Sequence, residues 1–366
     1  MHQREITYSL AHLRRMTDGT GMLQHAIFSV PNYTEGYDTD DNARALIAAI
    51  YLESSPAPGS SATSDTSSTS DTTDMPDLAA RYLAFLWYAF NQSTGRFRNF
   101  MSYDRRWLDE AGSDDSHARA LWAVGTVLGR SERPGPRGVA AKLFEGGLAA
   151  ARGFDHPRSW AFTLLGLDQY LRRCPDHQPA QHLRADLAAR LLRGLEATRD
   201  ANWLWFEDIL TYDNATLARA LLLAGHAMRR PEMVEAALSA LDWLVRVQRP
   251  DDGYFVPIGS NGFYPRHGAR ARFDQQPIEA YATVAACLEA YRITGQQRWQ
   301  AEASSAFAWF LGANDRQSPM YDPQSGGCYD GLEADRINQN QGAESTLAYL
   351  LSGLDWQLTA REVSAT

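Results

Sequence analysis

The chain has 366 residues, of which 44% are hydrophobic and 22% are charged, a composition typical of a globular protein with a large core. Its formal net charge of −9 disfavours a nucleic-acid partner, because an acidic protein repels the phosphate backbone. No stretch reaches the ~18 uninterrupted apolar residues expected of a membrane helix, so we expect no membrane partner.

The amino-terminal sequence MHQREITYSLAHLRR lacks the basic-then-apolar order of a secretory signal. The three cysteines, Cys174, Cys287 and Cys328, are odd in number and show no CxxC spacing. We interpret them as reduced thiols of a cytoplasmic protein. HExxH and a phosphate-binding glycine loop between a strand and a helix are absent, so we expect no metal and no cofactor.

Two kinds of predicted helix alternate along the chain. The amphipathic kind, expected on the outside, covers residues 7–16, 78–90, 137–151, 181–197, 236–248 and 301–312. The other kind begins with polar residues and continues with small and aliphatic residues, which is typical of buried inner helices. These segments lie in 36–49, 112–125, 158–171, 211–225, 276–291 and 339–353.

The motif ARAL gives the spacing of the inner helices, because it begins at residues 43, 118 and 218. The Ser/Thr/Asp-rich segment 54–76 cannot bury enough apolar surface to order itself, so we expect a disordered insertion there. Without it, the spacing is about 50 residues for each pair of helices. This regularity predicts an all-α (α/α)6 toroid, a single domain over residues 1–366, with short β-hairpins at one mouth.

Acidic residues accumulate at the starts of the first two inner helices, as DTDD at 38–41 and DD at 114–115. One acidic residue is enough to cap a helix, so the surplus indicates another role. The ARAL register aligns Asp40 with Asp115 on neighbouring helices, whose axes should lie about 8–10 Å apart. That separation overlaps the ~6.5–9.5 Å between the two carboxyl groups of inverting glycosidases. We therefore predict Asp40, Asp41 and Asp115 as catalytic residues.

Polar and aromatic residues also occur at the other inner-helix starts and in the turns before them. Carboxylates, amides and indoles are the groups that a hydroxyl-rich ligand needs, although each residue could instead cap a helix or close a turn. The predicted substrate-binding residues are His25, Tyr37, Asn42, Asp114, His117, Trp205, Glu207, Asp213, Asn214, Gln276, Glu279 and Glu344.

The segments GYDTDDNARAL, GSDDSHARALWAVG and QHAIFSVPN resemble the six-hairpin glycosidase superfamily, and more narrowly a group of bacterial glycosidase-like proteins associated with glycosyltransferases. The resemblance extends over nearly the whole chain outside 54–76. It implies a carbohydrate ligand and a functional association with glycosyltransferases. It leaves the reaction open, because the same architecture carries hydrolases, phosphorolytic enzymes, epimerases and lyases.

The leading prediction is a glycoside hydrolase that acts on an oligosaccharide by an inverting two-carboxylate mechanism, with the acid and the base unassigned. The alternatives are a sugar epimerase or lyase, and a non-catalytic carbohydrate-binding protein of a glycan-synthesis system. An epimerase would be expected to use histidine or another base pair across the sugar. DTDD also matches the DxDD pattern of class II terpene cyclases, but the polar helix starts disfavour a cavity for isoprenoids. The sequence does not determine the sugar, the linkage or the oligomeric state.

Overall fold

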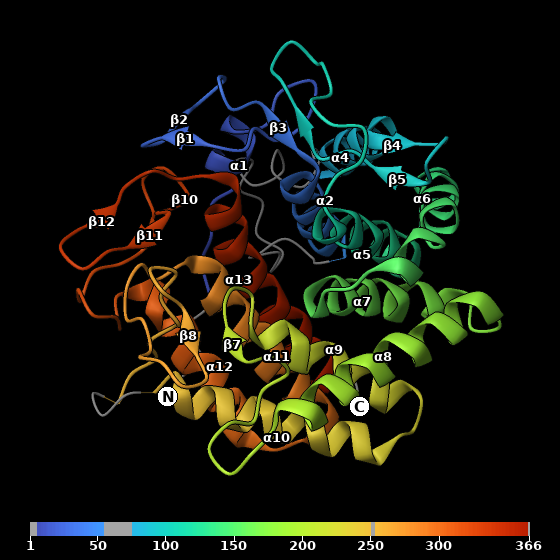
Figure 1. Ribbon diagram of the computed structural model, residues 1–366. Helices are drawn as coiled ribbons and strands as arrows, with labels where there is room; N and C mark the ends of the chain where they lie inside the picture. Colours follow the sequence, from blue (N-terminus) through green and yellow to red (C-terminus); the bar gives the residue numbers. More distant parts are fainter. Residues whose placement is uncertain (1–5, 55–74, 250–252, 365–366) are drawn as a thin grey trace. The chain divides into compact units, whose positions relative to one another are not determined.

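The computed structural model describes residues 6–54, 75–249 and 253–364 (Figure 1). The chain divides into two compact units. Unit 1 comprises Met1–Met16, His25–Pro31 and Ala188–Thr366, and unit 2 comprises Thr17–Gln24 and Asn32–Leu187. The prediction that a single domain spans the chain stays a prediction.

Unit 2 contains three inner helices that pack side by side, α2 (Thr39–Glu53), α5 (Asp114–Arg130) and α7 (Pro157–Arg173). Two further helices cover them: α4 (Met75–Ala89) packs against α2, and α6 (Pro134–Gly147) packs against α5. Most residues of the inner helices are buried on every face, whereas α4 and α6 bury one face each. This difference is the one that their sequence patterns predicted.

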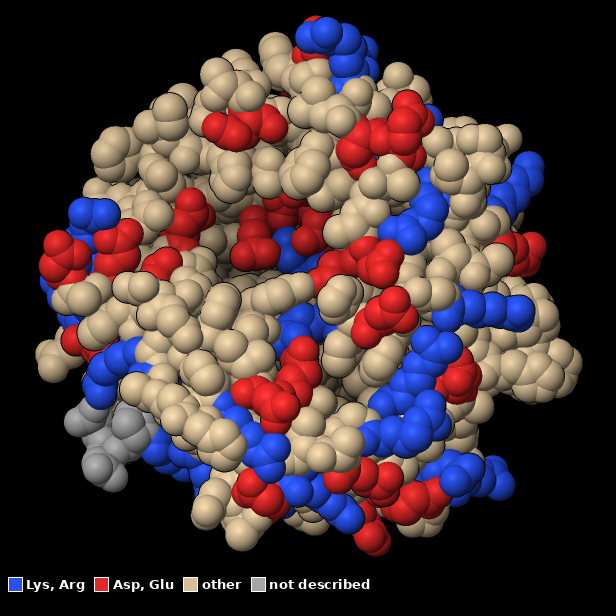
Figure 2. Space-filling model, viewed as in Figure 1, with Lys and Arg blue, Asp and Glu red and all other residues tan. Residues whose placement is uncertain are grey.

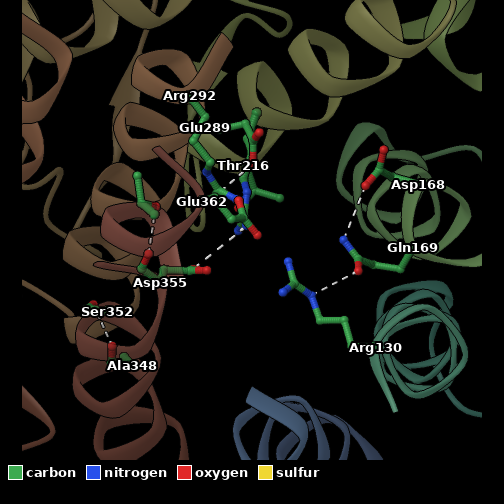
Figure 3. A network of polar contacts seen from close by, with 12 residues as sticks. Arg130, Asp168, Gln169, Thr216, Glu289, Arg292, Ala348, Ser352, Asp355 and Glu362 are labelled. Carbon is green, nitrogen blue, oxygen red and sulfur yellow. Dashed lines mark hydrogen bonds and ion pairs between the residues drawn. The ribbon is translucent and has the colours of Figure 1, made fainter. Parts of the chain in front are cut away.

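Contacts at both ends show that the inner helices of unit 2 run in the same direction. Near their beginnings, Asp40 of α2 pairs with Arg119 of α5. Near their ends, the guanidinium of Arg130 in α5 lies over the ring of Tyr51 in α2. The same guanidinium donates to Gln169 of α7 (Figure 3). The first turns of these helices therefore lie at the same end of unit 2.

Glycine allows α5 and α7 to approach closely. A Cβ atom added to Gly125 would lie 2.5 Å from the carbonyl oxygen of Gly166, and one added to Gly129 would lie 2.5 Å from that of Gln169. Both distances are too short for a real contact, so a larger residue at either position would push the two backbones apart.

Unit 1 repeats the arrangement with inner helices α9 (Ala215–Ala227), α11 (Pro277–Thr294) and α13 (Ala343–Ser364). Outer helices α10 (Pro231–Val247) and α12 (Gln297–Ala308) pack on α9 and α11, with a 3₁₀ turn at Trp309–Leu311. A 3₁₀ turn at Ala150–Gly153 precedes α7 in unit 2. After α7, helix α8 (Gln178–Thr198) carries the chain from unit 2 into unit 1.

The inner helices of unit 1 are also parallel. The amide of Asn214, at the start of α9, donates to Glu279 in the first turn of α11. At the other end, Arg292 of α11 pairs with Glu362 of α13 and with Glu289 of its own helix (Figure 3).

The first outer helix, α1 (Ala11–Arg15), is shorter than the predicted segment 7–16. The N–H of Ser9 donates to the Tyr321 hydroxyl at 2.9 Å, and the Ser9 hydroxyl accepts from the N–H of Ala11. These bonds engage the polar groups of residue 9 outside a helix, so the helix begins after them.

Short antiparallel strand pairs occupy the connections that lead into several inner helices. The strands are β1 (Ala26–Ile27), β2 (Val30–Pro31), β3 (Tyr37–Asp38), β4 (Phe90–Asn91), β5 (Arg96–Phe97), β6 (Phe100–Met101), β7 (Ile209–Leu210), β8 (Tyr264–Pro265), β9 (Tyr321–Asp322), β10 (Gly327–Cys328), β11 (Gly331–Leu332) and β12 (Ile337–Asn338). They pair as β1–β2, β3–β6, β4–β5, β7–β8, β9–β10 and β11–β12. The β3–β6 pair joins the segment before α2 to the segment before α5.

The six outer and six inner helices of the sequence prediction are all found. Most of the predicted insertion, residues 55–74, lies outside the described residues, and its last two positions belong to α4. Among the described residues, no helix is long and apolar enough to cross a membrane. On the face drawn in Figure 2, Asp and Glu side chains are interspersed with Lys and Arg.

Candidate functional site

The first acidic residue before α2 is its N-cap. The Oδ1 atom of Asp38 accepts a hydrogen bond from the N–H of Asp41 at 2.7 Å, and the backbone of Asp38 is extended. The next residue, Thr39, donates through its hydroxyl to the carbonyl of Arg98. One member of DTDD therefore caps the helix, and Asp40 and Asp41 are left for other contacts.

Asp40 connects two inner helices. Its Oδ1 lies 2.8 Å from Nε of Arg119 in α5, and its Oδ2 lies 3.2 Å from Nη2 of Arg44 in α2. The Asp40 side chain is 25% exposed, whereas both arginine side chains are almost fully buried. Two guanidinium groups within 4 Å favour the ionised form of this carboxylate. Asp40 is therefore a partly exposed anion that two buried arginines hold in place.

Asp41 points to the same arginine but lies deeper. Its Oδ1 accepts from Nη1 of Arg44 at 2.9 Å, and its side chain is only 4% exposed. Arg44 thus bridges two consecutive aspartates. This position suits Asp41 to holding Arg44, and through it Asp40, better than to touching a ligand.

The ARAL repeat places an arginine at the same position of three inner helices. In the structure Arg44, Arg119 and Arg219 occupy equivalent helix positions, and all three are buried. The Arg119 guanidinium also lies 3.8 Å from the ring centroid of Phe162 in α7, a cation–π contact. A repeated arginine in an otherwise apolar helix is the sequence signal that would have identified these residues.

The start of α5 provides a second carboxylate. Ser113 is the N-cap, because its hydroxyl accepts from the N–H of Ser116 at 3.1 Å. Asp114 pairs with Arg96 at 2.8 Å. Asp115 accepts a 2.6 Å hydrogen bond from the hydroxyl of Ser159 in α7. Asp40 and Asp115, which the ARAL register aligned, therefore lie in the first turns of two packed helices.

His156 is a candidate that the sequence prediction passed over. It is the exposed N-cap residue of α7, three residues before the Ser159 that contacts Asp115. The predicted segment began at residue 158, one residue after Pro157. A proline is favoured at the first helical position, and that preference would have placed His156 at the helix start.

His117 is a core residue. It is 0% exposed, its Nδ1 accepts from the N–H of Phe97 at 3.2 Å, and its Nε2 donates to the carbonyl of Gly147 at 3.0 Å. Burial lowers the pKa of His117 to about 3. The imidazole is therefore neutral, and both of its nitrogens are bonded inside the core, away from solvent.

Tyr37 and Asn42 hold the turn at residues 18–24 against α2. The Asn42 side chain accepts from the N–H of Met22 at 2.8 Å and donates to the carbonyls of Met22 and Asp38. The Tyr37 hydroxyl donates to Oδ2 of Asp18 at 2.6 Å, and burial raises the pKa of this tyrosine. Both side chains are at most 1% exposed, so they support the site without facing a ligand.

In unit 1 the predicted residues separate into buried and accessible sets. Asp213 and Asn214 are buried at the start of α9, where Asp213 accepts from the Thr216 hydroxyl. Trp205 is 0% exposed and packs against Phe206 and Trp243. Glu279 is buried, while Glu207, Gln276 and Glu344 are partly exposed and His25 is exposed.

Asp330 is a carboxyl group of unit 1 that lies outside the predicted set of site residues. Its Oδ1 accepts from the N–H of Gly342, just before α13, at 2.7 Å. Burial raises the pKa of Asp330, and His25 and Glu344 act on it electrostatically in opposite directions. The structure thereby relates His25 and Glu344, two predicted residues that are far apart in the sequence.

A surface pocket of about 320 Å³ lies elsewhere in unit 2, lined by Gly19, Thr20, Asp77, Arg81, Ala84, Phe85 and Tyr88. It contains none of the predicted site residues. No group of three or more His, Cys, Asp or Glu residues suited to a metal ion is found within the described part of the chain.

No protein-family model and no curated protein matches this chain. Solved structures do match its fold. Cellobiose 2-epimerase from Bacillus thermoamylovorans is 12% identical, with a TM-score of 0.71 over 97% of this chain and 96% of that one. A D-mannose isomerase is 11% identical, with a TM-score of 0.70 over 96% and 94% of the two chains.

A family 76 α-mannanase from Bacteroides thetaiotaomicron is 10% identical, with a TM-score of 0.61 over 90% of this chain and 88% of that one. At such low identity the likeness establishes the fold and not the reaction. The predicted all-α (α/α)6 fold class is confirmed.

Proposed function

We propose that this protein is a carbohydrate-active enzyme, and specifically a glycoside hydrolase that acts on an oligosaccharide. The observation that carries the proposal is the placement of Asp40 and Asp115 in the first turns of packed helices, with Arg119 reaching from α5 to Asp40. Neighbouring helix axes about 8–10 Å apart leave room for a water molecule between carboxylate and sugar.

The surroundings of Asp40 support its role as the general base. Arg44 and Arg119 favour its ionised form, which is the form that accepts a proton from water. Asp115 is then the general acid, with Ser159 orienting its carboxyl group. As the water oxygen attacks the anomeric carbon, Asp40 takes its proton and Asp115 protonates the departing glycosidic oxygen, which inverts the anomeric centre.

The test is turnover of a labelled oligosaccharide panel by Asp40→Asn and Asp115→Asn, with Asp176→Asn, in the exposed connection between α7 and α8, as the control. We expect each catalytic substitution to lower kcat by at least about 100-fold while the control stays near wild type. If both variants keep wild-type turnover on a substrate that the protein hydrolyses, the assignment of these carboxylates is wrong.

A sugar epimerase is the second candidate, because the structures reported above include a cellobiose 2-epimerase and a mannose isomerase. His156, at the start of α7 beside the Ser159 that contacts Asp115, offers a proton-transferring side chain for that reaction. Mass spectrometry and NMR of the products separate the two functions. Bond cleavage supports the hydrolase, and a mass-neutral conversion abolished by His156→Asn supports the epimerase.

The association with glycosyltransferases and the cytoplasmic location belong to the same proposal. The association rests on the sequence resemblance, and the location rests on the cysteine pattern. Copurification of a tagged chain from its native cell, followed by assay of the bound fraction for glycosyltransferase activity, tests the first. Fractionation of the same cells tests the second.

A further inference from the structure

Three tyrosine rings of unit 2 form a stack that runs from the interior to the surface. The rings of Tyr33 and Tyr103 are 4.6 Å apart and 23° from parallel. The rings of Tyr103 and Tyr37 are 6.3 Å apart and 16° from parallel. Tyr37 is 1% exposed, whereas Tyr103 is 48% and Tyr33 is 52% exposed. The stack therefore has a buried base and an open outer end.

Both outer tyrosines are carried by ordered turns. Next to Tyr33, the side chain of Asn32 accepts from the N–H and the hydroxyl of Thr34. Next to Tyr103, the N–H of Arg105 donates to the carbonyl of Ser102 at 2.8 Å. These local bonds fix the turns before any ligand arrives, which lowers the entropy cost of using the rings for binding.

The turn that carries Tyr103 is also tied to another part of unit 2. Nε of Arg105 donates to the hydroxyl of Thr20 at 3.0 Å, and Arg105 has a positive φ of 65°. A non-glycine residue in this conformation costs energy that the surrounding contacts must offset. The position of the ring is therefore determined by more than its own turn.

Tyr37, the base of the stack, lies close in the chain to the candidate catalytic residue Asp40. Tyr37 and Asp38 form β3, which pairs with β6 in the segment that carries Tyr103. Asp40 follows Tyr37 by three residues, so their Cα atoms lie no more than about 11 Å apart. The rings of Tyr103 and Tyr33 follow that of Tyr37 at spacings of 6.3 and 4.6 Å, so an oligosaccharide of several units with one unit at Asp40 can extend to them.

Tyr37 is the member of the stack that packs in the core. The half-exposed rings of Tyr33 and Tyr103 lie outside the core and are therefore available for another role. The apolar C–H face of a pyranose ring can pack on the outer ring of the stack, Tyr33, which Tyr103 supports from its inner side, and the hydroxyls of both tyrosines can bond to sugar hydroxyls. We propose that Tyr33 and Tyr103 form a subsite that holds a sugar unit of the oligosaccharide beyond the one bound at Asp40. This inference rests on the proposed function.

The experiment compares kcat and KM of Tyr33→Ala, Tyr103→Ala and Tyr103→Phe on cello-oligosaccharides and manno-oligosaccharides of increasing length. Tyr88→Ala is the matched control, because Tyr88 is 54% exposed and also contacts an aromatic ring, that of Trp107. We expect the two alanine variants to raise KM about tenfold for the longer substrates and to leave the shortest cleaved substrate unchanged. Tyr103→Phe should retain the ring contact and most of the affinity.

A loss that is equal for all substrate lengths, or no loss at all, overturns the subsite. Thermal unfolding of each variant separates a folding defect from a binding defect, and Tyr33→Leu, which removes the aromatic ring but keeps an apolar side chain, keeps the test valid if an alanine variant does not fold. If the tyrosine variants change self-association in sedimentation and not glycan affinity, the stack is a protein interface and the proposal is wrong.

The failure of the subsite and the failure of the hydrolase are distinguishable. Calorimetric titration of the Asp40→Asn variant with the same oligosaccharides measures binding without turnover. If glycans bind but the wild type cleaves none of them, the proposed hydrolase function is wrong. In that case, a lower glycan affinity of the Asp40→Asn/Tyr33→Ala double variant than of Asp40→Asn alone still supports the subsite. If no oligosaccharide binds, the subsite is overturned as well.

Discussion

Asp40 and Arg119 form an ion pair between two inner helices, with Oδ1 and Nε 2.8 Å apart and the arginine side chain only 3% exposed. The pair ties the first turn of α2 to α5, at a residue four positions after Asp115. A guanidinium in this position both positions the carboxylate and stabilises its charge. The ARAL repeat marks Arg119 in the sequence, but its pairing with Asp40 depends on how the two helices pack.

Replacing Arg119 with Met should affect both stability and catalysis. We expect the free energy of unfolding to fall by about 2 kcal/mol, because a partly buried anion loses one partner. We expect kcat/KM to fall about 100-fold, because Asp40 loses its fixed position. The acidic limb of the pH–rate profile should move to higher pH, because removing a cation makes the ionised carboxylate less stable.

Arg219→Met is the matched control, since Arg219 occupies the same ARAL position and pairs with Asp355. It should lose comparable stability, measured by urea unfolding, without the change in the pH–rate profile. An identical pH–rate profile for Arg119→Met and the wild type would contradict the role of Arg119 at Asp40.

His117 predicts a specific dependence of stability on pH. Its pKa is about 3 in the folded protein and near its ordinary value of 6.5 in the unfolded chain. Below pH 6.5 the unfolded state therefore binds a proton that the folded state does not, and stability is lost as the pH falls toward 3. The loss from this group should reach about 2 kcal/mol at pH 5.

Urea unfolding of the wild type and of His117→Gln at pH 7 and pH 5 measures this contribution. Glutamine does not titrate, so the variant should lose about 2 kcal/mol less than the wild type over this interval. Equal losses in the two proteins would show that His117 does not remain neutral in the folded state.

Asn214→Asp should produce the opposite pH dependence. The amide of Asn214 donates to the buried carboxylate of Glu279 at 2.8 Å, and the substitution would place two carboxyl groups together. We expect a loss of about 3 kcal/mol at pH 7, because like charges are then buried in contact.

The stability loss caused by Asn214→Asp should become smaller toward pH 5. The two carboxyl groups in contact take up a proton at a higher pH than the separate carboxyl groups of the unfolded chain. Thermal unfolding across this range measures it. Asn261→Asp, which adds the same charge at an exposed position, should change stability little. A pH-independent loss for Asn214→Asp would indicate that the two side chains do not interact as described.

Ser159→Ala removes the hydroxyl that donates to Asp115 at 2.6 Å. We expect kcat for the proposed hydrolysis to fall about tenfold, because the carboxyl group of Asp115 loses the hydrogen bond that orients it. Steady-state kinetics measures it, with Ser159→Thr as the variant that keeps the hydroxyl. Wild-type kcat in Ser159→Ala would mean that the hydroxyl does not orient the proposed acid.

The helical framework could be read from the sequence. The alternation of amphipathic and uniformly apolar segments predicted which helices cover and which are covered, and the ARAL spacing predicted their number. These signals are local or periodic, and burial follows them directly. Residues 38–41 contain more acidic side chains than one N-cap requires. That excess pointed to the helix start that carries the candidate site.

The particular contacts of the site could not be read in the same way. Local patterns did not indicate that Arg119 would reach Asp40, that Ser159 would donate a hydrogen bond to Asp115, or that Asp330 would accept one from the N–H of Gly342 just before α13. Each of these contacts joins residues that are distant in the sequence, so each depends on how the helices pack. His117 was predicted to bind substrate, but a helix start does not reveal that the neighbouring hairpin and Gly147 enclose the ring.

The sequence by itself determined the sets of helices, their order and the positions of their polar starts, because these depend on periodicity and capping along a single segment. Only the tertiary structure decided that Asp38 caps the helix, that Asp41 is buried on Arg44, and that Asp40 remains exposed. The physical reason is that the exposure and the charge state of a carboxylate depend on the groups packed around it, and for Asp40 a decisive group is supplied by another helix.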